Sequence, residues 1–195
     1  IYFVHGDMTR QELNSLYTHP KIKSIISATH GEGYGLPLFE AACNGLPVIA
    51  PGWSGHLDFL YAPVKAKNGK MKKKALFARV DYVLAPVQKE AVWKDIIHEE
   101  SMWCYPNKVD FKRKLRAMYT NHGMYLSWAK KLQAHVLANF REEDILKKML
   151  ESVVPDTVLN KPEYVFVSDM FSGQYNGGAE LSFQSIIDTT PSKRV

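Results

Sequence analysis

Two glutamates and three glycines in one short stretch are the residues of this sequence best suited to bind a ligand. Glu32 and Glu40 are separated by seven residues, and Gly31, Gly33 and Gly35 surround the first of them. Glycines let a backbone turn sharply and let a ligand come close to it. Carboxylates accept hydrogen bonds from hydroxyl groups. Such a pair of carboxylates at a glycine-rich turn suits a ligand that carries hydroxyls beside a phosphate, as a sugar nucleotide does.

The residues around this turn predict a strand, a helix and a second strand. Residues 24–28 and 47–50 are short apolar runs of strand composition. Residues 36–44 favour a helix, because Pro37 suits its first turn and an Asn-Gly pair can end it. The first N–H groups of a helix have no acceptor within it and readily bind anions. We therefore predict an anion site where the first strand gives way to the helix.

In this register the stretch resembles the E-x(7)-E signature of retaining glycosyltransferases with the GT-B fold. That superfamily includes sucrose synthases, glycogen synthases and many bacterial sugar transferases. The similarity covers residues 31–50, where E-G-Y-G-L-P, E-A and G-L-P-V-I-A accompany the two glutamates. It implies an α/β fold with a Rossmann-like, three-layer parallel sheet. The chain would then hold the C-terminal, nucleotide-sugar donor domain of a GT-B enzyme, incomplete at its N-terminus. The plainer alternative is an ordinary strand–helix–strand crossover whose glutamates bind nothing.

The resemblance also implies a role for each residue of the stretch. Glu32 would be the catalytic residue, in contact with hydroxyls of the transferred sugar near the reacting centre. Glu40 would accept hydrogen bonds from the ribose hydroxyls. The diphosphate and sugar would be held at the start of the helix by Gly33, Tyr34, Gly35, Leu36 and Pro37. Further candidates are His30, Ser54 and Gly55, although a tight strand-to-helix turn explains the last two equally well.

The implied reaction moves a sugar from a nucleotide-diphosphate donor to a glycan, lipid or protein acceptor, with retention of the anomeric configuration. No cofactor is required and no metal site is expected, because the 7 histidines are scattered singly and the 2 cysteines lack metal-ligand spacing. The helix start and basic residues would stabilise the charge of the leaving diphosphate. The resembled family places an Arg and a Lys for this purpose on an earlier turn, and its acceptor-binding domain also comes earlier. The isolated fragment is therefore expected to be inactive.

Two other classes of function stay open. One is a non-catalytic GT-B-like binding module. The other is a GT-B enzyme of different chemistry, such as a sugar-nucleotide epimerase or a phosphorylase, which would differ in its acceptor domain.

Composition and charge limit the partners. The chain has 195 residues, of which 46% are hydrophobic and 23% charged, and no apolar run reaches the roughly 20 residues of a membrane span. Residues 1–5 lack a basic signal start, so we expect a cytoplasmic protein. The net charge of +5 comes largely from residues 65–74 and 108–116. These runs suit solvated surfaces, and the functional alternatives are attraction of an anionic donor or peripheral contact with a membrane surface. Nucleic acid is not expected, because the basic runs lack interleaved aromatic residues.

The rest of the chain predicts the elements that frame this motif. Thr9 and Glu12 form a capping box for a helix that should stop near residues 19–20. Strands are expected at 1–4, 21–28 and 75–87, helices at 57–61, 109–121, 125–140 and 145–153, and an exposed, mobile insertion at 62–75. The donor domain is expected to cover 1–154 and a linker 155–162. Residues 163–195 would be the first strand, loop and helix of a following module, a second glycosyltransferase.

Overall fold

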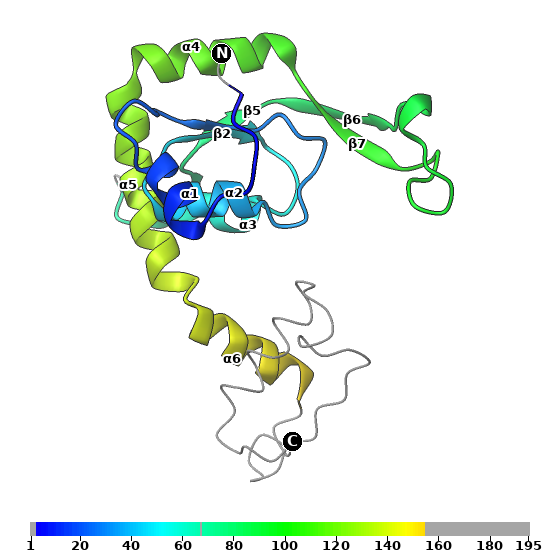
Figure 1. Cartoon of the computed structure of the whole chain (residues 1–195). Coiled ribbons are helices and arrows are strands. Elements are labelled where there is room, and N and C mark those ends of the chain that lie inside the picture. The colour runs from blue at the N-terminus through cyan, green and yellow to red at the C-terminus, as the bar shows by residue number, and fades with distance from the viewer. Residues whose placement is uncertain (1–2, 67, 155–195) are drawn as a thin grey trace. The chain divides into compact units, whose positions relative to one another are not determined.

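A parallel sheet of three strands, in the order β1-β2-β5, lies at the centre of the fold (Figure 1). It is seen in a computed structural model that describes residues 3–66 and 68–154. β1 (Ile25–Ile26) pairs in parallel with β2 (Val48–Pro51), and β2 pairs in parallel with β5 (Ala78–Val80). All four residues of β2 are buried. The predicted α/β class with a parallel sheet is confirmed.

The chain divides into two units, Ile1–Ala138 and Asn139–Val195. The expected linker at 155–162 and the expected following module at 163–195 lie outside the described residues. Of the second unit the structure describes α6 (Glu142–Val153), which has three acidic residues in its first turn. Among the described helices, none combines the length and apolar character that crossing a bilayer requires.

Helices cover both faces of the sheet in the first unit. Figure 1 shows α4 (Lys108–Thr120) along one face, with α2 (Leu36–Cys43) and α3 (Leu57–Leu60) on the other. α5 (His122–Asn139) follows α4 and buries one side of its length. The core between the sheet, α4 and α5 contains Ile49, Ala78, Val80, Met118 and Tyr125. The sheet is thus enclosed on two faces, which leaves its edges and strand ends for other contacts.

The helices on the α2 side begin and end as their local sequences predict. α1 (Arg10–Tyr17) starts with the expected capping box, in which Thr9 Oγ1 accepts from the Glu12 amide at 3.2 Å and the Glu12 carboxylate accepts from the Thr9 amide at 2.8 Å. α2 has Pro37 in its first turn and Asn44 as its C-cap. These ends are set by contacts within a few residues, which explains why the sequence predicts them.

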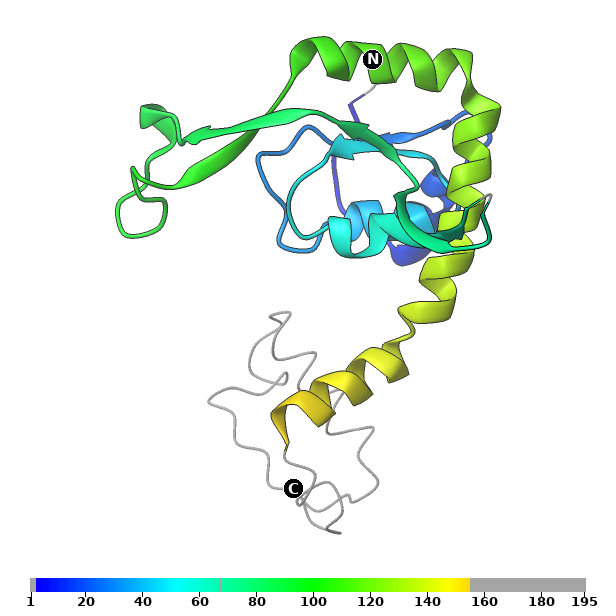
Figure 2. The same ribbon diagram turned by 180° about the vertical axis from the view of Figure 1, so that it is seen from behind.

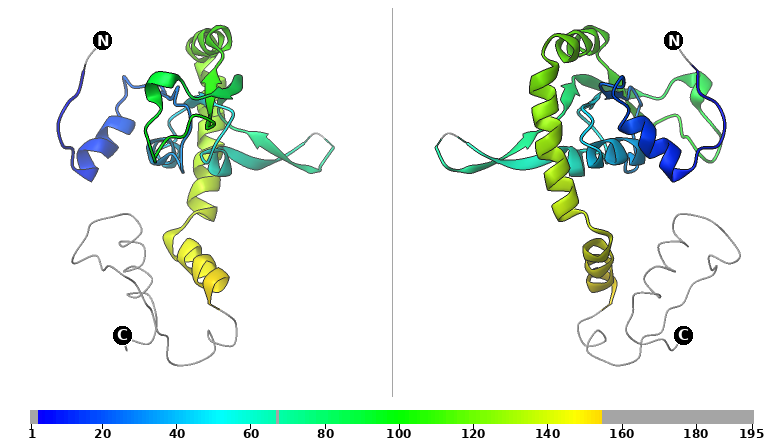
Figure 3. Two further views of the ribbon diagram at one scale, coloured as in Figure 1. Left: turned by 90° about the vertical axis from the view of Figure 1, so that its right-hand side faces the viewer. Right: turned by 60° about the vertical axis from the view of Figure 1, so that its left-hand side comes forward.

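Two antiparallel hairpins extend from this body. One pairs β3 (Tyr61–Lys65) with β4 (Met71–Ala75), and the other pairs β6 (Tyr82–Pro86) with β7 (Met102–Pro106). Figure 2 shows the β6–β7 hairpin reaching away from the sheet, and Figure 3 shows the β3–β4 hairpin doing so in another direction. A short 3₁₀ helix, η1 (Lys89–Ala91), lies between β6 and β7.

Three expectations need correction. Residues 62–75, expected as an exposed, mobile insertion, contain the two paired strands β3 and β4, so most of this segment is regular backbone. Residues 3 and 4 form no strand within the described chain, because no neighbouring strand pairs with them, and Phe3 is 87% exposed. The strand expected at 21–28 is shorter, since only Ile25 and Ile26 pair with β2.

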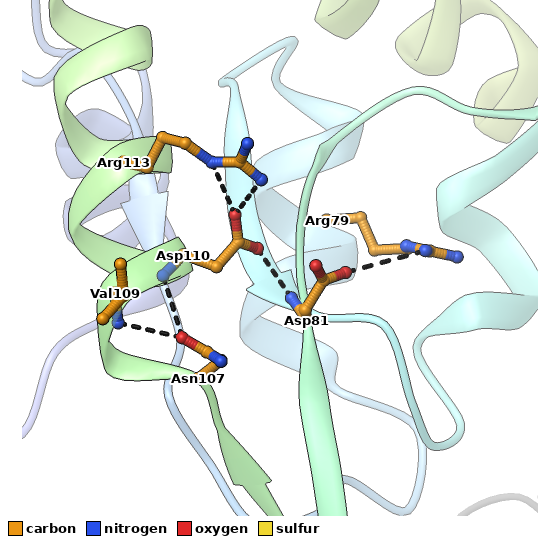
Figure 4. A network of polar contacts seen from close by, with 6 residues as sticks. All are labelled: Arg79, Asp81, Asn107, Val109, Asp110 and Arg113. Atoms are coloured by element: carbon orange, nitrogen blue, oxygen red, sulfur yellow. Dashed lines mark hydrogen bonds and ion pairs between the residues drawn. The ribbon is translucent and has the colours of Figure 1, made fainter.

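A buried carboxylate joins the corner after β5 to the start of α4 (Figure 4). Asp110 is 6% exposed; it accepts a hydrogen bond from the Asp81 amide at 2.8 Å and another from Arg113 Nε at 2.9 Å. Asn107 caps the helix by accepting from the Val109 and Asp110 amides. The contact fixes where the chain leaves the sheet and enters the β6–β7 hairpin.

Candidate functional site

The loops that follow β1 and β2 are hydrogen-bonded to each other at the carboxyl edge of the parallel sheet. Ser54 Oγ accepts from the Glu32 amide at 2.9 Å and donates to the Glu32 carbonyl at 2.6 Å. The Gly55 amide donates to the same carbonyl at 3.1 Å. Ligands of open α/β sheets bind at this edge. The backbone of the predicted catalytic residue is therefore held by two further predicted site residues.

The close approach of the two loops requires a glycine. A Cβ atom on Gly55 would lie 1.9 Å from the carbonyl oxygen of Gly33. Beside it, Ser54 has a φ of 93°, in the left-handed region that non-glycine residues rarely adopt. Strained backbone of this kind is concentrated at functional sites. Both observations show that the two loops are held in a shape that their backbones would not adopt separately without strain.

The start of α2 is open to a ligand. Gly35 is its N-cap, with a φ of 87°, and no side chain caps the helix. Leu36 and Pro37 follow it on the surface, and Leu36 is 61% exposed. The N–H groups of a first helical turn that lacks a side-chain cap attract anions. Pro37 has no N–H and the Leu38 amide donates to the Gly35 carbonyl at 2.9 Å, so an anion at this turn would be met by the Leu36 amide.

Tyr34 lies in this loop, but its ring packs on aromatic neighbours. Its ring centroid is 5.4 Å from that of Phe39 and 5.2 Å from that of Phe59. Tyr34 is 37% exposed, so one part of the ring still faces solvent. The packed part of the Tyr34 ring supports the loop, and only the exposed part of the ring is available to contact a ligand.

Glu40 lies in a pocket between α1 and α2. The pocket has a volume of about 620 Å³ and is lined by Arg10, Gln11, Leu13, Asn14, Tyr17, Leu36 and Glu40. The Tyr17 hydroxyl donates to the Glu40 carboxylate at 3.0 Å. Burial of Tyr17, followed by this hydrogen bond and by the charge of Glu40, raises the pKa of Tyr17 to about 12. The volume falls in the range typical of small-molecule sites.

Glu32 is not among the residues that line the pocket. The structure therefore brings Glu40 and Leu36 together with α1, and Glu32 together with Ser54 and Gly55. The two groups are joined by the residues 33–35 of the connecting loop. A ligand that reached both glutamates would have to lie across the start of α2.

His30 lies in the same loop but faces the β6–β7 hairpin. Its Nδ1 donates to the Cys104 carbonyl at 2.7 Å, and the Cys104 amide donates to the His30 carbonyl at 3.0 Å. Its ring stacks on Trp103, and the Tyr105 ring lies 4.9 Å from it. His30 thus anchors the hairpin against the loop. Nothing local in the sequence signals these partners, because they lie more than seventy residues further along the chain.

His56 is a further residue that the sequence reasoning missed. It is 1% exposed, and its Nε2 donates to the Pro51 carbonyl at 2.8 Å. Its Nδ1 is buried without a hydrogen-bond partner. A Cβ on Gly35 would lie 3.1 Å from the Cβ of His56, so this side chain packs directly under the N-cap of α2. It fixes the end of β2 relative to the helix start.

Comparisons with known proteins do not add to these observations. No protein-family model, no curated protein and no solved structure matches this chain. Within residues 3–66 and 68–154, no group of three or more His, Cys, Asp or Glu residues could hold a metal ion. What the site could do must be argued from the residues above. They offer a helix start for an anion and carboxylates for hydroxyl groups.

Proposed function

We propose that the first unit is the nucleotide-sugar donor domain of a retaining glycosyltransferase with the GT-B fold. One observation supports this most directly. The glycine-rich loop that carries Glu32 is held at the carboxyl edge of a parallel sheet by Ser54 and Gly55, and it leads directly into a helix whose Glu40 faces a ligand-sized pocket. The E-x(7)-E resemblance assigns donor binding to the same residues.

In this proposal the donor lies across the start of α2. The nucleoside occupies the pocket between α1 and α2, where Glu40 accepts hydrogen bonds from the ribose hydroxyls and Tyr17 orients its carboxylate. The diphosphate lies over residues 33–36, at the positive end of the helix dipole. Arg10 lines the same pocket and would contribute a positive charge to it. The transferred sugar then lies at Glu32.

The chain's own residues would act on the donor by position and charge. Each contact with the helix dipole contributes about 0.3–1 kcal/mol at an exposed site, so the helix start alone supplies a small part of the stabilisation of a leaving diphosphate. By resemblance, the acceptor glycan, lipid or protein would bind a separate N-terminal domain. Transfer with retention would occur between the two domains. Donor binding is therefore the activity to test in this chain.

The test is ligand-observed NMR of the 195-residue chain with UDP, GDP and ADP, and with their sugar conjugates. We expect one nucleotide to bind. Replacing a carboxylate that accepts from ribose removes a charged hydrogen bond of about 1.5–3 kcal/mol, so Glu40→Gln should weaken that binding at least tenfold. The matched control is Glu99→Gln, which neutralises an exposed glutamate outside the pocket. Equal binding by the native chain and Glu40→Gln would contradict the proposal.

A second substitution separates an enzyme from a binding module. Glu32→Gln should preserve nucleotide binding and weaken the binding of the sugar conjugate. It should also abolish transfer in a protein that includes the acceptor domain. Unchanged transfer by Glu32→Gln would remove Glu32 from the chemistry and leave a module that binds a donor only.

A further inference from the structure

The β3–β4 hairpin carries charge of one sign only. Its described charged residues are the exposed lysines Lys65, Lys70, Lys72, Lys73 and Lys74. No acidic residue occurs between Asp58 and Asp81 in the sequence. Among the described residues, none of these five lysines belongs to an ion pair. Their charge is therefore uncompensated by neighbouring side chains.

The strand register distributes these lysines over both faces of the hairpin. Cross-strand partners share a face and successive residues alternate. Val64 pairs with Lys72, whereas Lys65 pairs with Met71, so Lys72 and Lys65 lie on opposite faces. If the lysines lay on one face only, contact with a neighbouring domain or simple exposure of that face to solvent would explain them. Charge on both faces makes the whole outer part of the hairpin a positive arm.

The outer end of the hairpin also exposes an apolar side chain. Met71 is 61% exposed and stands at the start of β4, next to the turn that contains Asn68 and Gly69. The turn is closed by hydrogen bonds from the Ala66 amide to the Lys70 carbonyl and from the Gly69 amide to the Ala66 carbonyl. The Met71 side chain is flexible and apolar, and the neighbouring lysine side chains are charged. This combination suits the boundary between the head groups and the acyl chains of a bilayer.

The inner end of the hairpin is fixed to the body of the unit. Leu76 donates a backbone hydrogen bond to Leu60 at 3.1 Å, and the Tyr61 and Phe77 rings pack edge to face at 5.8 Å. The Lys74 ammonium lies 5.0 Å from the centre of the Trp128 ring on α5. Figure 3 shows the outer part extending clear of the sheet and helices. The hairpin is thus a supported arm with a free end.

We propose that this arm docks the protein on an anionic lipid bilayer, with the lysines at the head groups and Met71 in the interface. Lysines attract anionic lipid electrostatically and need no fixed geometry to do so. Nucleic-acid recognition relies instead on arginine forks and on aromatic rings that stack on bases. The hairpin has no arginine, and its one aromatic residue, Tyr61, lies at the inner end. The proposal is independent of donor binding.

The test is co-sedimentation of the full chain with phosphatidylcholine vesicles, with and without phosphatidylserine. We expect binding only to the anionic vesicles, and weaker binding as salt screens the attraction. One lysine near an anionic surface contributes roughly fivefold to partitioning, so removing three should weaken binding by about 100-fold. The variant replaces the three lysines without ring contacts, as Lys65→Gln, Lys70→Gln and Lys72→Gln. A separate Met71→Ser substitution should weaken binding several-fold at unchanged charge.

The control removes the same charge elsewhere. It carries three substitutions at exposed lysines outside the hairpin, Lys94→Gln, Lys108→Gln and Lys112→Gln. We expect this variant to lose much less binding than the hairpin variant. Equal losses would overturn the proposal, because they would show a response to net charge alone. It would also be overturned if the hairpin substitutions left vesicle binding intact but abolished binding to a structured RNA.

Discussion

His30 and Trp103 stack face to face, with ring centroids 4.6 Å apart and planes inclined by 12°. His30 belongs to the glycine-rich loop and Trp103 to β7, so this ring pair couples the candidate site to a hairpin formed much later in the sequence. The hydrogen bond from His30 Nδ1 to the Cys104 carbonyl fixes the ring in this orientation. The loop is therefore supported on one side by the β6–β7 hairpin and on the other by Ser54 and Gly55.

Replacing Trp103 should loosen the loop without unfolding the domain. Aromatic pairs contribute about 0.5–1.5 kcal/mol beyond the area they bury, so Trp103→Leu should lower the free energy of unfolding by about 1 kcal/mol or more. Amide hydrogen exchange should accelerate in residues 29–35. The matched control is Trp93→Leu, at a tryptophan that is 63% exposed near the end of the same hairpin. If both variants exchange alike in this loop, the stacking does not support it.

The contact between the two loops predicts opposite tolerance at two glycines. Gly55→Ala places a methyl group on the Gly33 carbonyl and should destabilise the fold by about 1–3 kcal/mol or more. Gly33→Ala meets no atom within 4 Å, so its effect should stay within about 0.5 kcal/mol. Urea denaturation of the two variants measures both values. Similar losses at the two positions would contradict the observed approach of the loops.

Tyr17 should titrate late. Its pKa in the folded protein is raised to about 12 from an ordinary 10.0, by burial first and then by Glu40. Because the folded state holds this proton more strongly, its contribution to stability is complete below pH 10 and is lost as the pH rises through about 12. Burial also raises the pKa of Tyr34 and of Tyr125, so an ultraviolet titration of the phenols should show a late component to which Tyr17 contributes. The contribution of Tyr17 should be lost in Tyr17→Phe and should move to lower pH in Glu40→Gln.

The Asp110 carboxylate should stabilise the folded state at pH values above about 3.8. Burial by itself raises the pKa of Asp110, but the hydrogen bonds from the Asp81 amide and Arg113 outweigh it and hold the pKa below its usual 3.8. A lowered pKa in the folded state contributes stability above pH 3.8, which is lost as the pH falls through the folded value. Asp110→Asn removes charge-assisted bonds of about 1.5–3 kcal/mol.

The pH dependence of this variant is the informative measurement. The difference in unfolding free energy between the native chain and Asp110→Asn should be largest near neutral pH and should shrink in acid. If the difference in unfolding free energy did not change with pH, the negative charge of Asp110 would not be what stabilises this corner. Asp144→Asn, at an exposed carboxylate of α6, serves as the control for a general effect of lost charge.

Local signals account for the parts of the fold that the sequence predicts. The capping box of Thr9 and Glu12 involves residues three apart, and Pro37 and Asn44 define the ends of α2 from within the helix itself. β2 is a buried apolar run, which marks a central parallel strand. The carboxyl-edge position of the glycine-rich loop follows from this order of elements. Its E-x(7)-E pattern could therefore be placed correctly on the fold, whereas its chemistry stays a prediction.

The parts that were missed depend on pairings between distant or unpatterned segments. β4 is Met71 followed by three lysines and an alanine, so it shows no alternation of polar and apolar residues. Its pairing with β3 is a matter of backbone hydrogen bonds and a tight turn. The partner of β6 likewise comes from residues 102–106, beyond a connection that carries no strand pattern. The stacking of Trp103 on His30 could not be anticipated without that pairing.

The contact of Gly55 with Gly33 has a consequence for how this protein can be altered or recombined. An insertion next to Gly33 or Gly55 should displace the backbone of the other loop, because a Cβ on Gly55 would already lie 1.9 Å from the Gly33 carbonyl oxygen. A graft that changed ligand preference would need to transfer both segments, 29–35 and 52–56, as one cassette. Chimeras exchanging one segment should fold poorly, and those exchanging both should retain the fold. The two loops should therefore be exchanged together in any redesign.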